Sequence, residues 1–269
     1  MRKKVDWWTN MNKARSDQEY YNKEENWKRL GISESIQDTV FMDEHQLKSM
    51  VGAVDSGVIA EVTVKNEHPE VIVVASSVED YILNKADMSL KTAVLNFSSF
   101  TNPGGRYIDG SMAQEEALCH ATTLYPVLKS FERDFYGPHN KMKNRGLYVS
   151  EMLYSPGIRF KDNEDVSVDI ITMAAPFARA ALRNGVSMSL INETIFHRLE
   201  QVFAVAVASG VDRLVLGAYG CGVFQNDTEW VAKCVKSLTE HYGKYFKEVV
   251  NPIPAGRNYS IFLKVAKEG

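Results

Sequence analysis

The segment AVLNFSSFTNPGGRYIDGSMAQEEALCHATTLYP, residues 93–126, holds a strand, a glycine loop and a helix start in immediate succession. Residues 93–97 are a short apolar run of the kind that forms a buried strand. Residues 102–110 are rich in Asn, Pro, Gly and Asp, which favour turns. Ser111 is followed three residues later by Gln114, a capping-box pattern that predicts a helix start at Ser111. The acidic pair after Gln114 is therefore expected in the first turns of a helix.

The acidic pair is Glu115 and Glu116, and it would lie beside the glycines of the loop. Gly104 and Gly105 lack a Cβ, so the backbone there can approach a ligand closely or adopt positive φ. Unpaired N–H groups at a helix start favour anions such as phosphates. Neighbouring helical side chains point about 100° apart, so one carboxylate could hold a hydroxyl while the other moves a proton, as glycosidic cleavage requires. The structural alternative is that the helix dipole alone favours acidic residues in a first turn.

A second glycine-rich loop, GAYGCGVFQND, spans residues 217–227. It follows a predicted strand at 213–217 and precedes a helix for which Asn226 or Asp227 is the expected cap. This arrangement is typical of phosphate-binding loops. The glycine spacing matches neither the dinucleotide fingerprint nor a P-loop. Taken alone, the loop could be a tight turn.

The two loops together resemble the microbial-type poly(ADP-ribose) glycohydrolases, which have a macrodomain fold. That family carries three glycines, a short spacer and Gln-Glu-Glu. Here Asn102-Pro103-Gly104-Gly105 is followed by Arg106, seven further residues and Gln114-Glu115-Glu116. The flanking LNFSS and TLYP segments also fit, whereas Arg106 replaces the third glycine. The resemblance covers roughly residues 55–265.

The resemblance implies an ADP-ribosyl glycohydrolase that hydrolyses the O-glycosidic bond of poly(ADP-ribose) or ADP-ribosylated acceptors and releases ADP-ribose. Glu116 would protonate the leaving oxygen and then activate water, while Glu115 would position ribose hydroxyls. In the family the second loop holds the diphosphate, and its Phe, here Phe224, packs against the distal ribose. No cofactor and no metal are implied. The implied ligand-binding residues are Asn96, Asn102, Gly104, Gly105, Arg106, Gln114, Gly220, Cys221, Gly222, Val223 and Phe224.

Several alternatives remain open from the sequence. Asn96 could contact ribose or be a buried, turn-satisfying residue. Arg106 could point outward as a solvated charge or pair with a phosphate of the ligand. The chain could also be a non-catalytic ADP-ribose reader. The acceptor, whether a poly(ADP-ribose) chain, a protein or a nucleic acid, and the oligomeric state are both open.

The composition indicates a soluble globular protein, because 45% of the 269 residues are hydrophobic and 24% are charged. The net charge of -3 argues against a general nucleic-acid binder. Three cysteines form neither a disulfide framework nor a zinc pattern. The adjacent Cys119 and His120 are not expected to form a nucleophilic pair, because helical neighbours point apart. The N-terminus lacks an apolar signal segment and no apolar run reaches membrane-span length, so we expect a cytoplasmic protein without membrane partners.

The order of predicted elements gives an α/β class, with helices on both sides of a mixed sheet. We predict one macrodomain-like three-layer α/β/α domain at residues 51–269, preceded by an N-terminal helical extension at residues 1–50. Strands are predicted at 58–64, 71–75, 93–97, 147–154, 166–173 and 213–217, and helices at 77–85, 111–124, 188–209 and 226–242.

Overall fold

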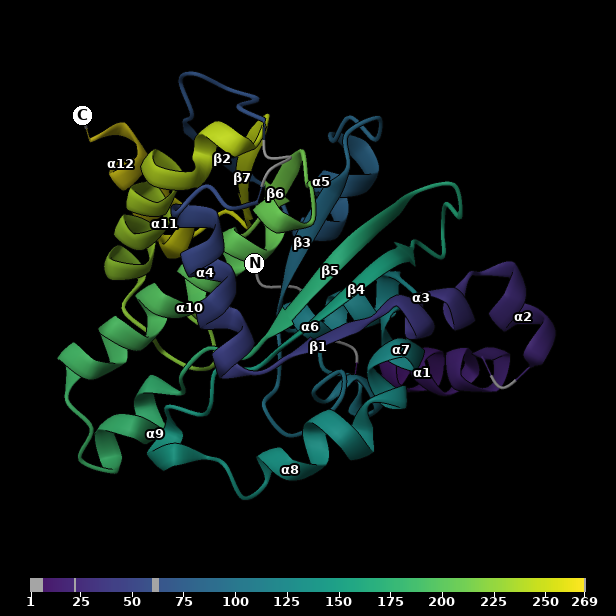
Figure 1. The fold of residues 1–269 in the computed structure, drawn as a ribbon. Coiled ribbons are helices and arrows are strands. Elements are labelled where there is room, and N and C mark those ends of the chain that lie inside the picture. The colour runs from purple at the N-terminus through teal and green to yellow at the C-terminus, as the bar shows by residue number, and fades with distance from the viewer. Residues whose placement is uncertain (1–6, 22, 60–62, 269) are drawn as a thin grey trace.

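The computed structural model describes residues 7–21, 23–59 and 63–268, and within them the centre of the molecule is a seven-stranded mixed sheet (Figure 1). The strand order is β1-β4-β5-β3-β6-β7-β2. From β5 to β2 in this order all neighbours are parallel, whereas β4 is antiparallel to both of its neighbours. The carboxyl ends of β5, β3, β6, β7 and β2 therefore meet at one edge. The strands are β1 Val40–Met42, β2 Val71–Ala75, β3 Thr92–Phe97, β4 Met152–Arg159, β5 Ser167–Met173, β6 Arg213–Val215 and β7 Glu248–Ile253.

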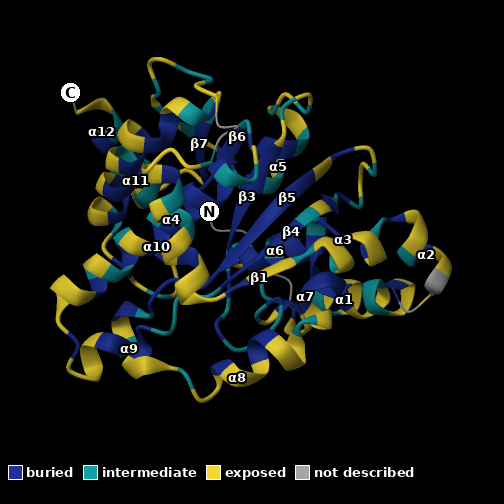
Figure 2. Cartoon of the chain, viewed as in Figure 1, coloured by how far each residue is buried: buried dark blue, intermediate teal, exposed yellow. Residues whose placement is uncertain are grey.

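Helices cover both faces of the sheet, so the predicted three-layer α/β/α class is confirmed. Side chains alternate along β3: Ala93 and Leu95 pack in one core cluster with α4, α10, α11 and α12, and Val94 packs in the other with α1, α5, α6 and α7. Figure 2 shows the buried strands between helices whose outer faces are exposed. The helices are α1 Trp7–Tyr21, α2 Glu24–Arg29, α3 Ile32–Asp38, α4 Glu44–Asp55, α5 Val78–Asn84, α6 Gln114–Ala121, α7 Leu124–Ser130, α8 Gly137–His139, α9 Ala178–Arg183, α10 Met188–Ala208, α11 Thr228–Tyr242 and α12 Arg257–Lys267.

Most predicted elements are present, with two differences among the strands. The strand predicted at 147–154 begins later and continues through Pro156, because an irregularity in pairing between Ser155 and Ile158 absorbs the turn-forming residues. Of the strand predicted at 58–64, residues 60–62 lie outside the described residues, and the remainder is not in a strand.

The described part of residues 1–50 includes α1, α2, α3, β1 and the start of α4, and it is part of the sheet and core. β1 pairs with β4, and Ala14 and Tyr21 of α1 are buried in the core cluster that contains Val94. The predicted boundary at residue 50 falls inside α4. The described part of residues 1–50 therefore packs against the rest of the chain rather than standing apart from it.

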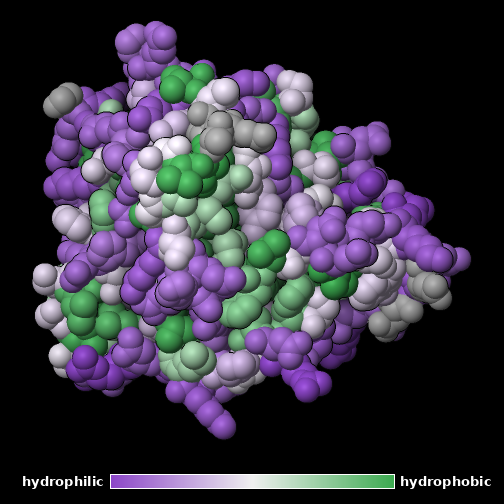
Figure 3. Space-filling model, viewed as in Figure 1, coloured by the Kyte–Doolittle hydropathy of each residue, from purple (hydrophilic) through white to green (hydrophobic). Residues whose placement is uncertain are grey.

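The face seen in Figure 3 is largely hydrophilic, and hydrophobic side chains gather near its centre and also where α9 is followed by α10. Leu182, Met188 and Leu190 are exposed in this region. None of these three side chains lines the cavity described below. In the described part of the chain, no helix combines the length and apolar character needed to span a membrane.

Candidate active site

A cavity of about 840 Å³ opens at the carboxyl edge of the parallel strands. Its wall takes residues that follow each of these strands: Ser77 after β2, Ser99 after β3, Ala175 after β5, Ala218 after β6 and Pro254 after β7. Ligands of open α/β sheets bind at this edge, where successive loops diverge. The volume lies within the range of small-molecule sites.

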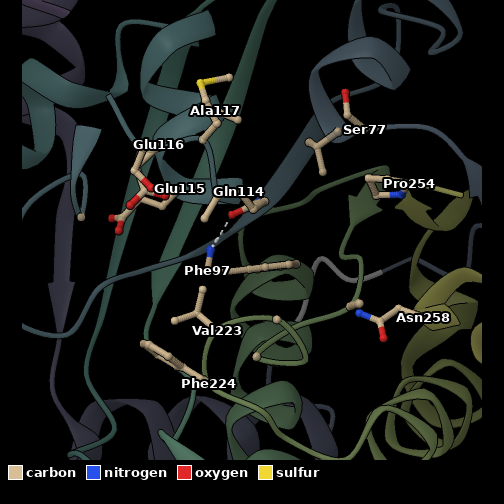
Figure 4. Close-up of a pocket in the computed structure, with 18 of the residues that line it drawn as sticks. Ser77, Phe97, Gln114, Glu115, Glu116, Ala117, Val223, Phe224, Pro254 and Asn258 are labelled. Carbon is tan, nitrogen blue, oxygen red and sulfur yellow. Dashed lines mark hydrogen bonds between the residues drawn. The ribbon is translucent and has the colours of Figure 1, made fainter. Parts of the chain in front are cut away.

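The side chain of Gln114 joins the first loop to the central strand (Figure 4). Its Oε1 accepts a hydrogen bond from the Phe97 N–H at 2.8 Å, and its Nε2 donates to the Leu95 carbonyl at 2.8 Å. The predicted capping box is wrong: α6 begins at Gln114, its cap position is Ala113, and no side chain caps it. Ser111 instead belongs to the preceding turn, where its N–H donates to the Arg106 carbonyl. The helix start is thus fixed on the end of β3 by a glutamine amide.

Glu115 lies beneath the loop, with 3% of its surface exposed. Its Oε2 accepts a hydrogen bond from the Ser99 N–H at 2.7 Å. Its Oε1 accepts longer hydrogen bonds from Asn96 Nδ2 at 3.3 Å and from Ser98 Oγ at 3.4 Å. The strand end and the loop after it therefore hold this carboxylate in one position.

Glu116 is also buried, and its Oε1 accepts a hydrogen bond from the Arg106 N–H at 2.9 Å. Gly105 packs against both carboxylates, and all three residues line the cavity. A Cβ at Gly105 would lie 2.6 Å from Glu116 Oε1 and 3.0 Å from Glu115 Oε2, and its φ of +60° also favours glycine. Both oxygens thus lie close to one point, and only a glycine leaves that point free.

Burial raises the pKa of Glu115 to about 8. The hydrogen bond from Ser99 acts in the opposite direction, and the neighbouring charge of Glu116 adds to the increase. The Glu115 carboxyl therefore retains its proton near neutral pH. A pair of this kind is suited to general acid catalysis at pH 7.

The second loop, residues 217–227, lies across the cavity from the first loop. It lines the cavity with the backbone of its glycines and with the Phe224 ring. Gly220 has φ +71°, and a Cβ there would lie 2.6 Å from Asn226 Nδ2. At Gly222 an added Cβ would meet no atom within 4 Å, so this position faces open space. Phe224 stacks on Phe177 with ring centroids 5.1 Å apart. Figure 4 shows Val223 and Phe224 on the side of the cavity opposite Glu115 and Glu116.

Most residues singled out from the sequence lie on this cavity wall. They are Asn102, Gly105, Arg106, Gln114, Glu115, Glu116, Gly220, Gly222, Val223 and Phe224.

Three others do not line the cavity. Asn96 is fully buried and donates a hydrogen bond to Glu115, which fits the alternative of a buried residue. A Cβ at Gly104 would lie 2.8 Å from the Tyr125 ring, so this glycine is required by packing. The thiol of Cys221 lies 3.5 Å from the Tyr219 carbonyl and is partly buried against the core.

Two parts of the wall were missed from the sequence. One is the start of α5, where Glu79 has a buried Oε1 with no hydrogen-bond partner among the described residues, and burial raises the pKa of this carboxyl. The other is the segment between β7 and α12, which contributes Gly256, Arg257 and Asn258. The sequence could have indicated these two segments only by their position, because each one follows a parallel strand and therefore lies at the ligand-binding edge of the sheet.

The remaining candidate chemistry is not supported by the geometry. Cys119 is fully buried, and burial raises the pKa of its thiol well above the usual value, which disfavours the thiolate. Burial also lowers the pKa of His120 to about 4. Among the described residues, no group of three or more His, Cys, Asp or Glu side chains could hold a metal ion.

Comparison with known proteins assigns the family. Residues 2–162, more than half of the chain, match the microbial-type PARG catalytic domain. The chain belongs to this family. The matched residues include the first loop and the Glu115–Glu116 pair, whereas the second loop, residues 217–227, lies beyond them. No curated protein matches the chain.

Solved poly(ADP-ribose) glycohydrolase structures share the fold of this PARG family member. The enzyme from Thermomonospora curvata has 25% sequence identity and a TM-score of 0.75, over 87% of this chain and 88% of that one. The enzyme from Deinococcus radiodurans in complex with ADP-ribose has 26% identity and a TM-score of 0.76, over 87% of this chain and 96% of that one. The Thermomonospora curvata enzyme bound to the inhibitor ADP-HPD has 26% identity and a TM-score of 0.72, with 87% of each chain covered.

Proposed function

We propose that the chain hydrolyses the O-glycosidic bond of poly(ADP-ribose) with Glu116 as general acid and then general base, and with Glu115 positioning the ribose hydroxyls. Glu116 donates a proton to the leaving oxygen as the bond from that oxygen to the anomeric carbon breaks. Water then adds to the oxocarbenium-like carbon, and Glu116 takes up its proton. The products are ADP-ribose and an acceptor that carries a hydroxyl group. No cofactor takes part in these steps.

The buried Glu115–Glu116 pair beneath Gly105, at the wall of a cavity of about 840 Å³, carries this proposal. Burial disfavours the charged form of a carboxyl, so a buried pair is better suited to acid catalysis at neutral pH than an exposed pair in a helical first turn. The ADP-ribose bound in the relative from Deinococcus radiodurans supports the same ligand for this cavity. We further propose that the second loop holds the diphosphate, and that Phe224 packs against the distal ribose.

We expect the rate of ADP-ribose release to fall as the pH rises through about 8. Burial raises the pKa of Glu115 to about 8, so the protonated form predominates below this pH and is lost above it. Ionisation of Glu115 removes the proton with which it can donate a hydrogen bond to a ribose hydroxyl, and it places a negative charge beside the general acid Glu116. The measurement is a profile of kcat against pH on poly(ADP-ribose). A rate that stays constant across pH 8 would show that this proton is not used.

We expect Gly222→Val to weaken ADP-ribose binding at least about tenfold, because a branched Cβ would block backbone approach to the diphosphate. An added Cβ at this position meets no protein atom within 4 Å, so the free energy of unfolding should change little. Titration calorimetry gives the affinity, and thermal unfolding of the same sample gives the control. Unchanged affinity in the folded variant would make the second loop a turn without a ligand contact.

We assign the fold to the macrodomain type and the protein to the cytoplasm, where the three free cysteines would stay reduced. ADP-ribose or an ADP-ribosylated macromolecule is the proposed partner.

A further inference from the structure

Arg106, which stands where the family has a third glycine, makes two separate contacts. Its N–H donates to Glu116 Oε1 at 2.9 Å. Its guanidinium turns the other way and pairs with Asp109, with Nε and Oδ2 3.2 Å apart. The side chains of this ion pair are 69% and 52% exposed. The backbone N–H of Arg106 thus binds the Glu116 carboxylate, while its guanidinium is exposed to solvent at the cavity wall.

Two large apolar side chains on the same loop are also exposed. Ile108 is 45% exposed and Met112 is 44% exposed, and Met112 lines the cavity. These two residues and Arg106 belong to one loop, and we name the three of them, Arg106, Ile108 and Met112, the acceptor patch. A cation beside exposed apolar surface is complementary to a nucleotide, which carries both phosphates and a flat apolar base.

The position of Glu116 indicates which part of the substrate would meet this patch, an argument that rests on the proposed function. The ADP-ribose unit being released fills the cavity, and Glu116 protonates the oxygen that departs. The leaving group must therefore lie at the edge of the cavity next to Glu116, where Arg106 is bonded through its N–H. In a poly(ADP-ribose) chain the leaving group is the adenosine of the next unit, which bears a diphosphate.

We propose that the acceptor patch binds the leaving ADP-ribose unit, with the Arg106 guanidinium on its diphosphate and Ile108 and Met112 against its adenine. In the free protein the Arg106 guanidinium forms an ion pair with Asp109. An exposed ion pair is weak, so a phosphate can replace the carboxylate. Arginine suits this exchange because its planar fork matches a phosphate. Arg106 then determines specificity for polymer over acceptors that lack phosphate.

The test compares two substrates that release the same ADP-ribose from different leaving groups. One is linear poly(ADP-ribose), and the other is the 4-nitrophenyl glycoside of ADP-ribose, whose leaving group has no phosphate. We expect Arg106→Gln to lower the ratio of kcat/KM for polymer to that for the glycoside about tenfold, the loss typical of one charge-assisted hydrogen bond. The effect should be smaller at high salt. Asp109→Asn, which removes the competing carboxylate, should raise the ratio.

Arg133→Gln is the matched control, because Arg133 is 95% exposed, pairs with the adjacent Asp134 and does not line the cavity. It removes the same charge and should leave the ratio unchanged. An unchanged ratio in Arg106→Gln would overturn the proposal. So would an equal loss of affinity for free ADP-ribose, which would assign the guanidinium to the phosphates of the released unit. If the unmodified chain cleaves neither substrate, the proposed function itself fails, and the acceptor patch with it.

Discussion

Glu116→Gln should lower the turnover of poly(ADP-ribose) by at least about 100-fold while ADP-ribose binding is retained, since that is the usual contribution of a general acid–base group. A glutamine Oε1 can still accept the hydrogen bond that Arg106 N–H now donates at 2.9 Å, so the loop should keep its position. The amide cannot donate its proton to the leaving oxygen as a carboxylic acid does. Steady-state turnover measures the loss, and titration calorimetry with ADP-ribose measures the binding that remains.

Glu132→Gln is the control for this change. Glu132 is an exposed partner of Lys129 and does not line the cavity, so the same chemical substitution there should leave turnover unaltered. Near-normal turnover in purified Glu116→Gln would remove Glu116 from the mechanism.

Gly105→Ala should also reduce turnover by about 100-fold, because it displaces the Glu116 carboxylate without changing its chemical nature. The new Cβ would lie 2.6 Å from Glu116 Oε1, closer than atoms pack, so the carboxylate must move. A misplacement of about 1 Å at a reacting group can cost about 100-fold in rate. The φ of +60° adds strain of about 1–3 kcal/mol to the folded state. Turnover and the free energy of unfolding are to be measured on the same preparation.

Gly185→Ala separates these two effects. Gly185 has φ +74° and no atom within 4 Å of an added Cβ, and it lies between α9 and α10 outside the cavity wall. In Gly185→Ala the free energy of unfolding should fall because of the backbone strain, whereas turnover should stay unchanged. If Gly105→Ala retained turnover as well as Gly185→Ala does, the carboxylate pair would not need the fixed position that the structure gives it.

The sequence predicted the parts of the site that local patterns encode. The apolar run at 93–97, the glycines after it and the acidic pair placed β3, the loop and α6 in the correct order. The glycine spacing at 217–227 likewise located the second loop at the cavity. These features depend on neighbours in the chain, which a sequence displays directly.

The missed features depend on contacts between distant segments. Gln114 caps nothing in its own helix, because its amide bonds to the backbone of β3, and a capping pattern cannot reveal such a bond. The burial of Asn96 against Glu115 of α6 likewise depends on a residue 19 positions away in the sequence. The wall formed by Glu79 and Asn258 comes together only when β2 and β7 pair, at 71–75 and 249–253.

The most direct test is incubation of the purified chain with poly(ADP-ribose), followed by chromatography for free ADP-ribose, with Glu116→Gln as the comparison. We predict that the unmodified chain releases ADP-ribose and that the Glu116→Gln protein, which still binds ADP-ribose, releases at least about 100-fold less. An unmodified chain that binds ADP-ribose yet releases none would contradict hydrolysis and identify a reader of ADP-ribose.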